Sequence, residues 1–105
     1  MYKIYISGAI EGNSNYVKEF TEAEQTLKKK GFEVLSPIRT KASMNNLPPK
    51  FCLLDALDFL KQADMICIIN DISQSKGAKI ERDIANYCNI PIVNYELLKE
   101  EKWYE

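Results

Sequence analysis

Hydrophobic residues recur along this chain at two periods, one typical of β-strands and one typical of α-helices. Residues 2–6 alternate in polarity and are rich in β-forming residues, so they predict a strand. Residues 65–69 form a continuous apolar run, which is typical of a central parallel strand covered on both faces. The other predicted elements are strands at 32–35 and 90–93, and helices at 16–30, at 51–63 and after Gly77.

The alternation of strands and helices predicts a single α/β domain over residues 1–105. Right-handed crossovers make it a doubly wound, flavodoxin- or Rossmann-like parallel sheet of about four strands with flanking helices. Ligands of such sheets bind at the carboxyl ends of the strands, near the point where strand order reverses. We therefore expect a crevice lined by residues 7–12, residues after Leu35, residues 70–77 and the following helix start.

Two segments lack a sustained hydrophobic period. The segment from Pro37 to Lys50 contains paired asparagines and several prolines, and we expect it to be a long loop that covers the site. The last residues form an acidic, aromatic tail. Its Trp103 and Tyr104 either pack on the domain or make an oligomer contact.

Glu81 stands out on the last predicted helix. At about 100° per residue, Glu81 falls inside the apolar arc, and it is the one carboxylate that the pattern places inward. A buried carboxylate needs a partner, a pocket or a shifted pKa. The apolar side is expected to hold Ile80, Ile84, Tyr87 and Cys88, and the polar side Lys79, Arg82, Asp83 and Asn86.

Composition narrows the chemistry. The formal charge of −1, with no basic cluster, argues against nucleic-acid binding. The absence of histidine excludes serine-histidine and cysteine-histidine nucleophiles and the usual zinc ligand sets, so we expect neither a metal nor a cofactor. The chain has no long apolar run and no leader-like start, which predicts a cytoplasmic protein that does not bind membranes. Three widely spaced cysteines are expected to be buried free thiols.

Two loop motifs point to a known family. Residues 5–12 (Tyr-Ile-Ser-Gly-Ala-Ile-Glu-Gly) follow the first strand, and residues 75–81 (Ser-Lys-Gly-Ala-Lys-Ile-Glu) follow the third. This pair resembles the nucleoside 2-deoxyribosyltransferase superfamily, which includes deoxynucleoside 5'-monophosphate N-glycosidases. The resemblance is strongest to a branch of small proteins frequent in phages and prophages, and it extends from Tyr2 to about Val93.

The resemblance implies a catalytic Glu81 that attacks the anomeric carbon of a nucleoside and releases the base. It implies that Tyr5 orients this carboxylate, and that Ser75 and the backbone around Gly77 bind sugar or 5' oxygens. It also implies a homo-oligomer, since relatives complete their sites across a subunit interface. The crevice rule adds further candidate substrate-binding residues, namely Ser7, Gly8, Ala9, Gly12 and Asp71.

Some positions differ from the family pattern. Ala9 and Glu11 stand where the monophosphate glycosidases carry a serine and an arginine, which favours an unphosphorylated nucleoside or a different ligand. Asp55 and Asp58 miss the spacing of the aspartate that the family places before the third strand, and both project on the polar face of their predicted helix. Each of them either reaches the site or is simply solvated. Groups that some relatives supply from a C-terminal segment have no evident match.

Each candidate also has a structural interpretation. Tyr5 could be a core residue, Ser75 a helix cap, Gly77 a turn glycine and Asp71 a turn residue. The cations of the long loop, Arg39 and Lys41, either hold an anionic ligand or are solvated.

Three functions remain open on the sequence. The first is an N-glycosidase or deoxyribosyltransferase that works through Glu81. The second is a module that binds a nucleoside or nucleotide in the same crevice without turnover. The third is an interaction protein that uses only the scaffold.

Overall fold

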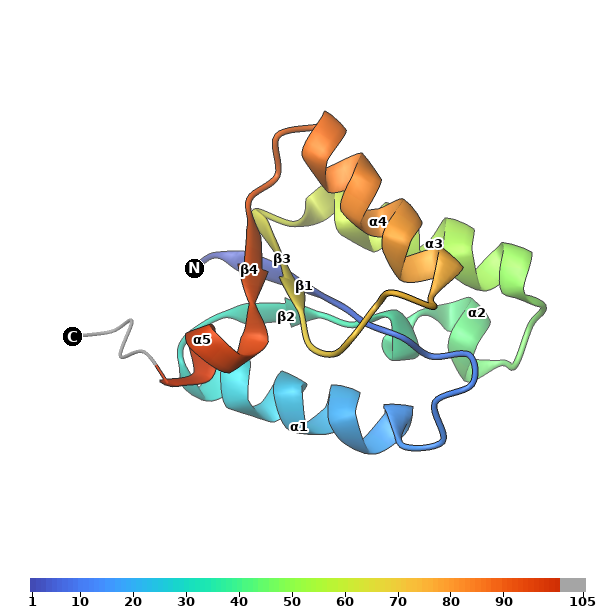
Figure 1. Cartoon of the computed structure of the whole chain (residues 1–105), viewed down its shortest axis with the longest axis horizontal. Coiled ribbons are helices and arrows are strands. Elements are labelled where there is room, and N and C mark those ends of the chain that lie inside the picture. The colour runs from blue at the N-terminus through green and yellow to red at the C-terminus, as the bar shows by residue number, and fades with distance from the viewer. Residues whose placement is uncertain (101–105) are drawn as a thin grey trace.

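A computed structural model, which describes residues 1–100, contains a four-stranded sheet with helices on both faces (Figure 1). The strands are β1 (Lys3–Ser7), β2 (Glu33–Leu35), β3 (Met65–Ile68) and β4 (Ile92–Asn94). All three pairings are parallel, in the order β2-β1-β3-β4, so the strand order reverses at β1. The predicted doubly wound α/β fold is therefore confirmed.

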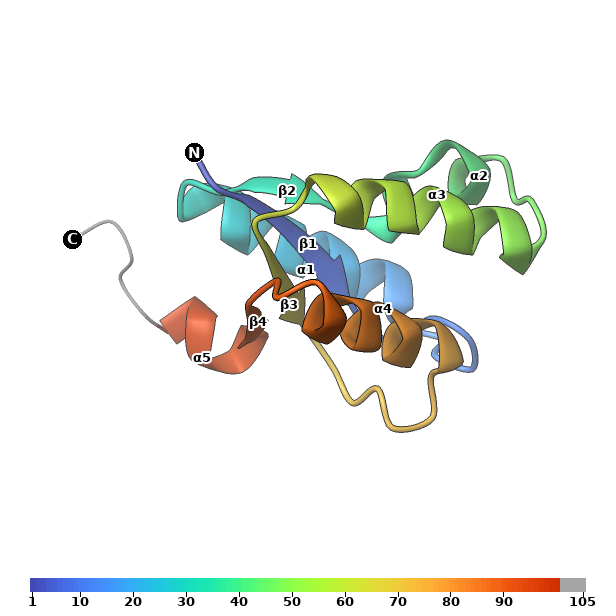
Figure 2. The same cartoon turned by 90° about the horizontal axis from the view of Figure 1, so that it is seen from above.

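The helices form one layer on each face of the sheet. Figure 1 shows α1 and α5 on one side and α3 and α4 on the other, and Figure 2 shows α3 and α4 side by side. Their bounds are α1 (Tyr16–Lys29), α2 (Lys41–Met44), α3 (Pro49–Gln62), α4 (Lys76–Tyr87) and α5 (Tyr95–Glu100), with a 3-10 turn η1 at Pro37–Arg39. None of the helices within residues 1–100 has the length and apolar character needed to cross a membrane.

The two-residue period of β1 divides the core into two clusters. Ile4 and Ile6 face α1, where they pack with Phe20 and Leu27. Tyr5 faces the opposite layer and packs with residues of α3 and α4. Because Ser7 is two residues from Tyr5, it shares this second face, and both side chains are fully buried.

The prediction of a long loop between Pro37 and Lys50 is wrong. The segment instead forms η1 and the single-turn helix α2, and α3 already begins at Pro49. Side-chain hydrogen bonds stabilise α2. Thr40 caps this helix by accepting from the Ser43 amide at 3.1 Å, and Asp55 of α3 accepts from the Ala42 amide at 3.0 Å. Such caps satisfy helix-end amides in elements too short to show a period.

The predicted apolar arc of α4 is rotated from the observed one. Its buried residues are Ala78, Glu81 and Ala85, whereas Tyr87 is 89% exposed and Cys88 is also exposed. Small alanines let α4 lie close to its neighbours, while Ile84 is half-buried against the same cluster and Ile80 is exposed. Glu81 is nevertheless buried, as expected.

Two further expectations need correction. Of the cysteines, only Cys67 is buried, and burial raises the pKa of its thiol to about 12; Cys52 is half-buried and Cys88 exposed. The expected tail begins with the helix α5, which buries Tyr95 and Leu98 against the core. The tail residues Trp103 and Tyr104 lie outside the described residues.

Candidate active site

The carboxylate of Glu81 lies between two hydroxyl groups of β1. The Tyr5 hydroxyl donates to Oε2 at 2.6 Å, and the Ser7 hydroxyl donates to Oε1 at 2.7 Å. These lengths are typical of hydrogen bonds to an ionised carboxylate. The Glu81 side chain is buried, with 6% of its surface exposed. It extends from α4 to the carboxyl end of the central strand β1, which supplies both hydrogen-bond donors.

Burial dominates the electrostatics of this triad. It raises the pKa of the Glu81 carboxyl, and the hydrogen bonds from Tyr5 and Ser7 lower that pKa without cancelling the rise. Burial, followed by the charge of Glu81, raises the pKa of the Tyr5 hydroxyl well above its ordinary value. Tyr5 therefore remains a proton donor at neutral pH, and Glu81 is a carboxylate of increased basicity held in a fixed orientation.

The N-terminus of α4 carries two of the predicted substrate-binding residues. The Ser75 hydroxyl caps the helix by accepting from the Ala78 amide at 3.2 Å, which leaves its proton free to donate. A Cβ atom at Gly77 would meet no heavy atom within 4 Å, and the backbone there is not left-handed. A turn therefore does not require glycine at position 77, and the space beside it is open. Glu81 lies in the second turn, where the helix dipole contributes little to its ionisation.

The loop after β1 depends on glycine for two different reasons. At Gly8 an added Cβ would come within 2.9 Å of the Ile69 side chain and 3.0 Å of Asn70 Oδ1, so only glycine allows this approach. Gly12 has φ +73°, a left-handed conformation that favours glycine. Between them, the Ala9 amide donates to Asn70 Oδ1 at 2.7 Å. Residues 7–12 and 70–77, which are expected to line one crevice, are thus in direct contact through Ala9 and Asn70.

Asn70 is a residue of this edge that the sequence interpretation did not single out. It joins Ala9 to Glu19 of α1, and Asn13 completes the same cluster. Its position directly after the apolar run at residues 65–69 is the signal that marks it, because a polar residue there lies at the carboxyl end of a central strand.

Asp71 serves as a turn residue at this edge. It is exposed and accepts from the Ser73 amide at 2.9 Å, and this hydrogen bond lowers the pKa of its carboxyl. Such an Asx turn matches the structural interpretation of Asp71. Its carboxylate still faces solvent, where a ligand can reach it.

The remaining candidate aspartates have structural partners away from Glu81. Asp55 is half-buried and caps α2, while the exposed Asp58 lies 4.0 Å from the Lys61 ammonium. Lys41 is exposed at the start of α2. Within the described part of the chain, no group of three or more acidic or cysteine side chains is arranged to hold a metal ion.

Glu24 is a second inward carboxylate, which corrects the expectation that Glu81 is alone. It is 8% exposed, and the Arg39 guanidinium donates to both of its oxygens, at 3.0 Å and 3.3 Å. This hydrogen bonding and the charge of Glu24 raise the pKa of Arg39. Arg39 is therefore engaged in joining α1 to η1, which accounts for its charge without a ligand.

We expect the substitution Arg39→Met to lower the free energy of unfolding by about 1–2 kcal/mol, because it leaves the Glu24 carboxylate buried without its donor. Urea denaturation of this variant beside Lys41→Met, which removes a neighbouring exposed cation, checks the expectation. Equal unfolding midpoints for the two variants would contradict the pairing.

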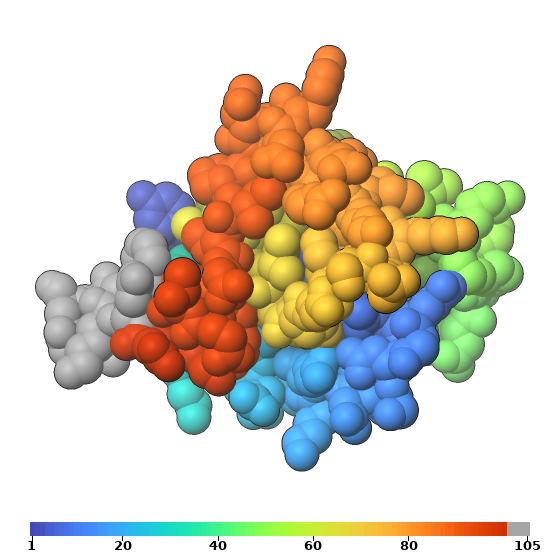
Figure 3. All heavy atoms as spheres, in the orientation of Figure 1, coloured from blue at the N-terminus to red at the C-terminus, as the bar shows by residue number. Residues whose placement is uncertain are grey.

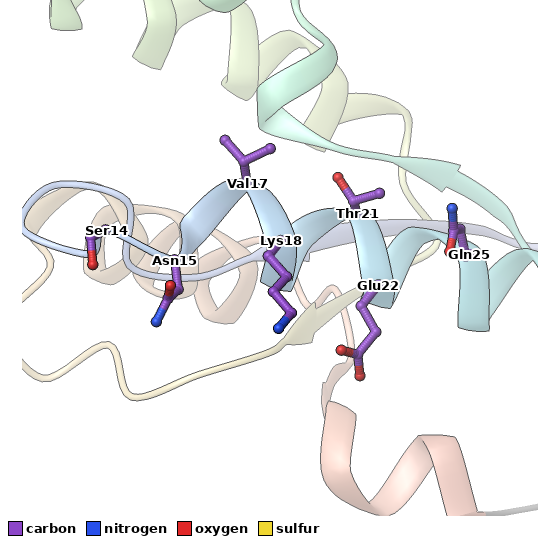
Figure 4. Close-up of a pocket in the computed structure, with 7 residues that line it drawn as sticks. All are labelled: Ser14, Asn15, Val17, Lys18, Thr21, Glu22 and Gln25. Carbon is purple, nitrogen blue, oxygen red and sulfur yellow. The ribbon is translucent and has the colours of Figure 1, made fainter.

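Two surface hollows lie within the described part of the chain, and Glu81 lines neither of them. One of about 550 Å³ follows the outer side of α1, where Val17 and Thr21 point one way and Lys18 and Glu22 the other (Figure 4). A second, of about 350 Å³, lies at the carboxyl ends of β3 and β4. Figure 3 shows this region where the segment after β3 meets α5. Its lining residues are Ile68, Ile69, Asn70, Asp71, Asn94 and Glu96. The second hollow thus coincides with the predicted ligand edge.

Comparison with known proteins relates this geometry to nucleoside chemistry. The solved structure of a 2-deoxyribosyltransferase from the psychrotolerant bacterium Bacillus psychrosaccharolyticus is similar, with a TM-score of 0.66 and 25% sequence identity over 88% of this chain and 70% of that chain. That enzyme is described as a biocatalyst for the synthesis of antiviral and antitumoral nucleosides. The similarity supports the resemblance to the nucleoside 2-deoxyribosyltransferase superfamily.

A family model matches most of the sequence. No curated protein matches the sequence significantly. The model of the family described as a domain of unknown function, DUF4406, matches residues 2–94, which include both loop motifs and every strand. The chain therefore belongs to the DUF4406 family.

Proposed function

We propose that this protein is a nucleoside N-glycosidase or 2-deoxyribosyltransferase in which Glu81 is the nucleophile. The observation that carries the proposal is the buried Glu81 carboxylate, held by Tyr5 and Ser7 at the carboxyl end of β1. The similarity to a 2-deoxyribosyltransferase supports a related nucleoside-transfer function.

The proposed reaction has two steps. An oxygen of Glu81 forms a bond to the anomeric carbon of the sugar while the bond from that carbon to the base nitrogen breaks. The bonding electrons leave with the base, which takes up a proton from solvent. A second base or a water molecule then displaces the Glu81 carboxylate from the sugar and releases a proton to solvent. A nearby anion stabilises the oxocarbenium-like transition states of both steps.

The surrounding groups have matching roles in this proposal. Tyr5 and Ser7 each donate one hydrogen bond, so each Glu81 oxygen keeps a lone pair for the sugar. The raised pKa increases the basicity of the carboxylate and hence its nucleophilicity. The free Ser75 proton and the open space at Gly77 suit a sugar oxygen at the start of α4.

The substrate we propose is an unphosphorylated nucleoside. Ala9 offers no side-chain donor, and the exposed Glu11 adds negative charge to the loop after β1. A 5'-phosphate there would meet repulsion instead of a cation.

We also propose that the protein forms a homo-oligomer, and light scattering tests this proposal.

A non-catalytic binding module is the second candidate. The observation that favours it is the limited access to Glu81, which is 6% exposed and lines neither of the two hollows described above. Thermal stabilisation by a nucleoside without any product would be its signature.

Chromatography after incubation with a mixed panel of nucleosides and nucleotides tests the proposal. We expect free base to appear from at least one deoxynucleoside with the wild-type protein, and none with Glu81→Ala. Base release by both proteins, or by neither, would contradict catalysis through Glu81.

We expect Gly77→Ala to separate binding from folding. Alanine favours helices by up to about 1 kcal/mol over glycine, so the free energy of unfolding should be unchanged or higher. The added methyl group occupies the open space at the helix start, so KM for the nucleoside should rise about tenfold or more. The control is Gly31→Ala, which strains a backbone with φ +95° and should lower stability without changing KM. An unchanged KM for Gly77→Ala would contradict a ligand at this position.

A further inference from the structure

The side chain of Asn70 joins the loop after β1 to the loop after β3. Its Oδ1 accepts from the Ala9 amide at 2.7 Å, and its Nδ2 lies 3.4 Å from the Ala9 carbonyl. Both polar groups of one backbone residue therefore contact one side-chain amide. The close approach is possible because Gly8 has no Cβ.

Glu19 anchors this contact from α1. Its Oε1 accepts from Asn70 Nδ2 at 2.9 Å and from Asn13 Nδ2 at 3.0 Å, and Asn13 Nδ2 also donates to the Ala9 carbonyl at 3.0 Å. Hydrogen bonds to a charged acceptor are stronger than neutral ones. The network thus fixes Ala9 relative to both β3 and α1.

We propose that Asn70 is a positioning residue for the reaction at Glu81, an inference that rests on the proposed function. Ser7 and Ala9 are separated only by Gly8, so the backbone that carries the Ser7 donor is continuous with the backbone that Asn70 holds. A shift of Ala9 moves the Ser7 hydroxyl, and with it the Glu81 carboxylate. Displacements of about 1 Å at such a distance from the chemistry can cost about 100-fold in rate.

A swap of donor and acceptor tests this role. In Asn70→Asp one oxygen still accepts from the Ala9 amide, but the other faces the Glu19 carboxylate and repels it. We expect kcat/KM to fall about 10- to 100-fold. In the combined Asn70→Asp and Glu19→Gln variant a donor again faces an acceptor between these two side chains, but Asn13 Nδ2 loses its Glu19 acceptor. We therefore expect kcat/KM to exceed the product of the two single effects by about tenfold without reaching the wild-type value.

The matched control is Asn86→Asp, which introduces the same charge on the exposed face of α4 and should leave kcat/KM unchanged. If Asn70 only stabilised the fold, each loss of kcat/KM would match the loss of folded protein. Thermal unfolding measures the folded fraction separately. Wild-type kcat/KM in Asn70→Asp would overturn the proposal. So would a combined variant no more active than the product of its single effects.

A second measurement does not depend on turnover. Hydrogen exchange of the Ala9 amide, followed by NMR, should be slow in the wild-type protein and fast in Asn70→Ala. Unchanged exchange in Asn70→Ala would refute the positioning role, whatever the protein catalyses. A third outcome combines two observations: the wild-type protein turns over no nucleoside, and the Ala9 amide exchanges fast in Asn70→Ala. This outcome would refute the proposed function and would retain Asn70 as the residue that holds the loop.

Discussion

Replacing Glu81 with glutamine is expected to lower kcat by about 10⁴-fold or more, because an amide is a far weaker nucleophile than a carboxylate of the same shape. One of the Tyr5 and Ser7 hydroxyls can still donate to the amide oxygen, and the other can accept from the amide nitrogen. Steady-state kinetics on the nucleoside that the wild-type protein accepts gives the measurement. The matched control is Glu22→Gln, an exposed residue of α1, which should retain full activity.

The same variant should be at least as stable as wild type at neutral pH. The folded-state pKa of Glu81 is raised, so its contribution to stability is complete below the unfolded-state pKa and is lost as pH rises through the folded-state pKa. Glutamine removes this loss, and its free energy of unfolding should depend less on pH. A Glu81→Gln protein that keeps its activity would contradict the assignment of Glu81 as nucleophile, and one that unfolds at neutral pH would contradict the expected stability.

Removing both hydroxyls of the triad, with Tyr5→Phe and Ser7→Ala together, is expected to have the second largest effect. The Glu81 carboxylate then stays buried without donors, and the free energy of unfolding should fall by about 3 kcal/mol near pH 8. The hydrogen bonds lower the pKa of Glu81, so their loss raises it further. The destabilisation should therefore shrink as the pH falls from about 8 to about 4.5 and the carboxyl takes up a proton.

Urea denaturation at both pH values measures this effect. The control is Tyr2→Phe with Ser14→Ala, which removes two exposed hydroxyls and should change stability equally little at either pH. A loss of stability that is independent of pH would show that the Tyr5 and Ser7 hydroxyls act through packing and not through the charge of Glu81.

The sheet could be predicted from sequence because its strands carry clear apolar signals. The buried run at residues 65–69 and the alternation at residues 2–6 both form central strands. The helices between Pro37 and Lys50 could not, because caps at Thr40 and Asp55 determine them. The predicted buried face of α4 was wrong because the prediction counted tyrosine and cysteine as apolar residues. In the structure the small alanines lie at the closely packed contact.

The site was predicted in part. Helical periodicity places Glu81 inward, and strand periodicity places Tyr5 on the same face as Ser7. The hydrogen bond from Ser7 to Glu81 depends on the position of α4 along the direction of β1. Neither the helical nor the strand period of the sequence determines that position. The same holds for Asn70, whose partners come from residues 51 and 61 positions away.

Intact-protein and peptide mass spectrometry tests the nucleophilic role of Glu81 most directly. The protein is incubated with a 2'-fluoro nucleoside, whose electron-withdrawing fluorine slows release of the sugar, and is then quenched in acid. The proposed reaction predicts a mass increase of one sugar on the peptide that contains Glu81, and no increase for Glu81→Gln. Base release without a labelled peptide, or a sugar attached to another residue, would contradict it.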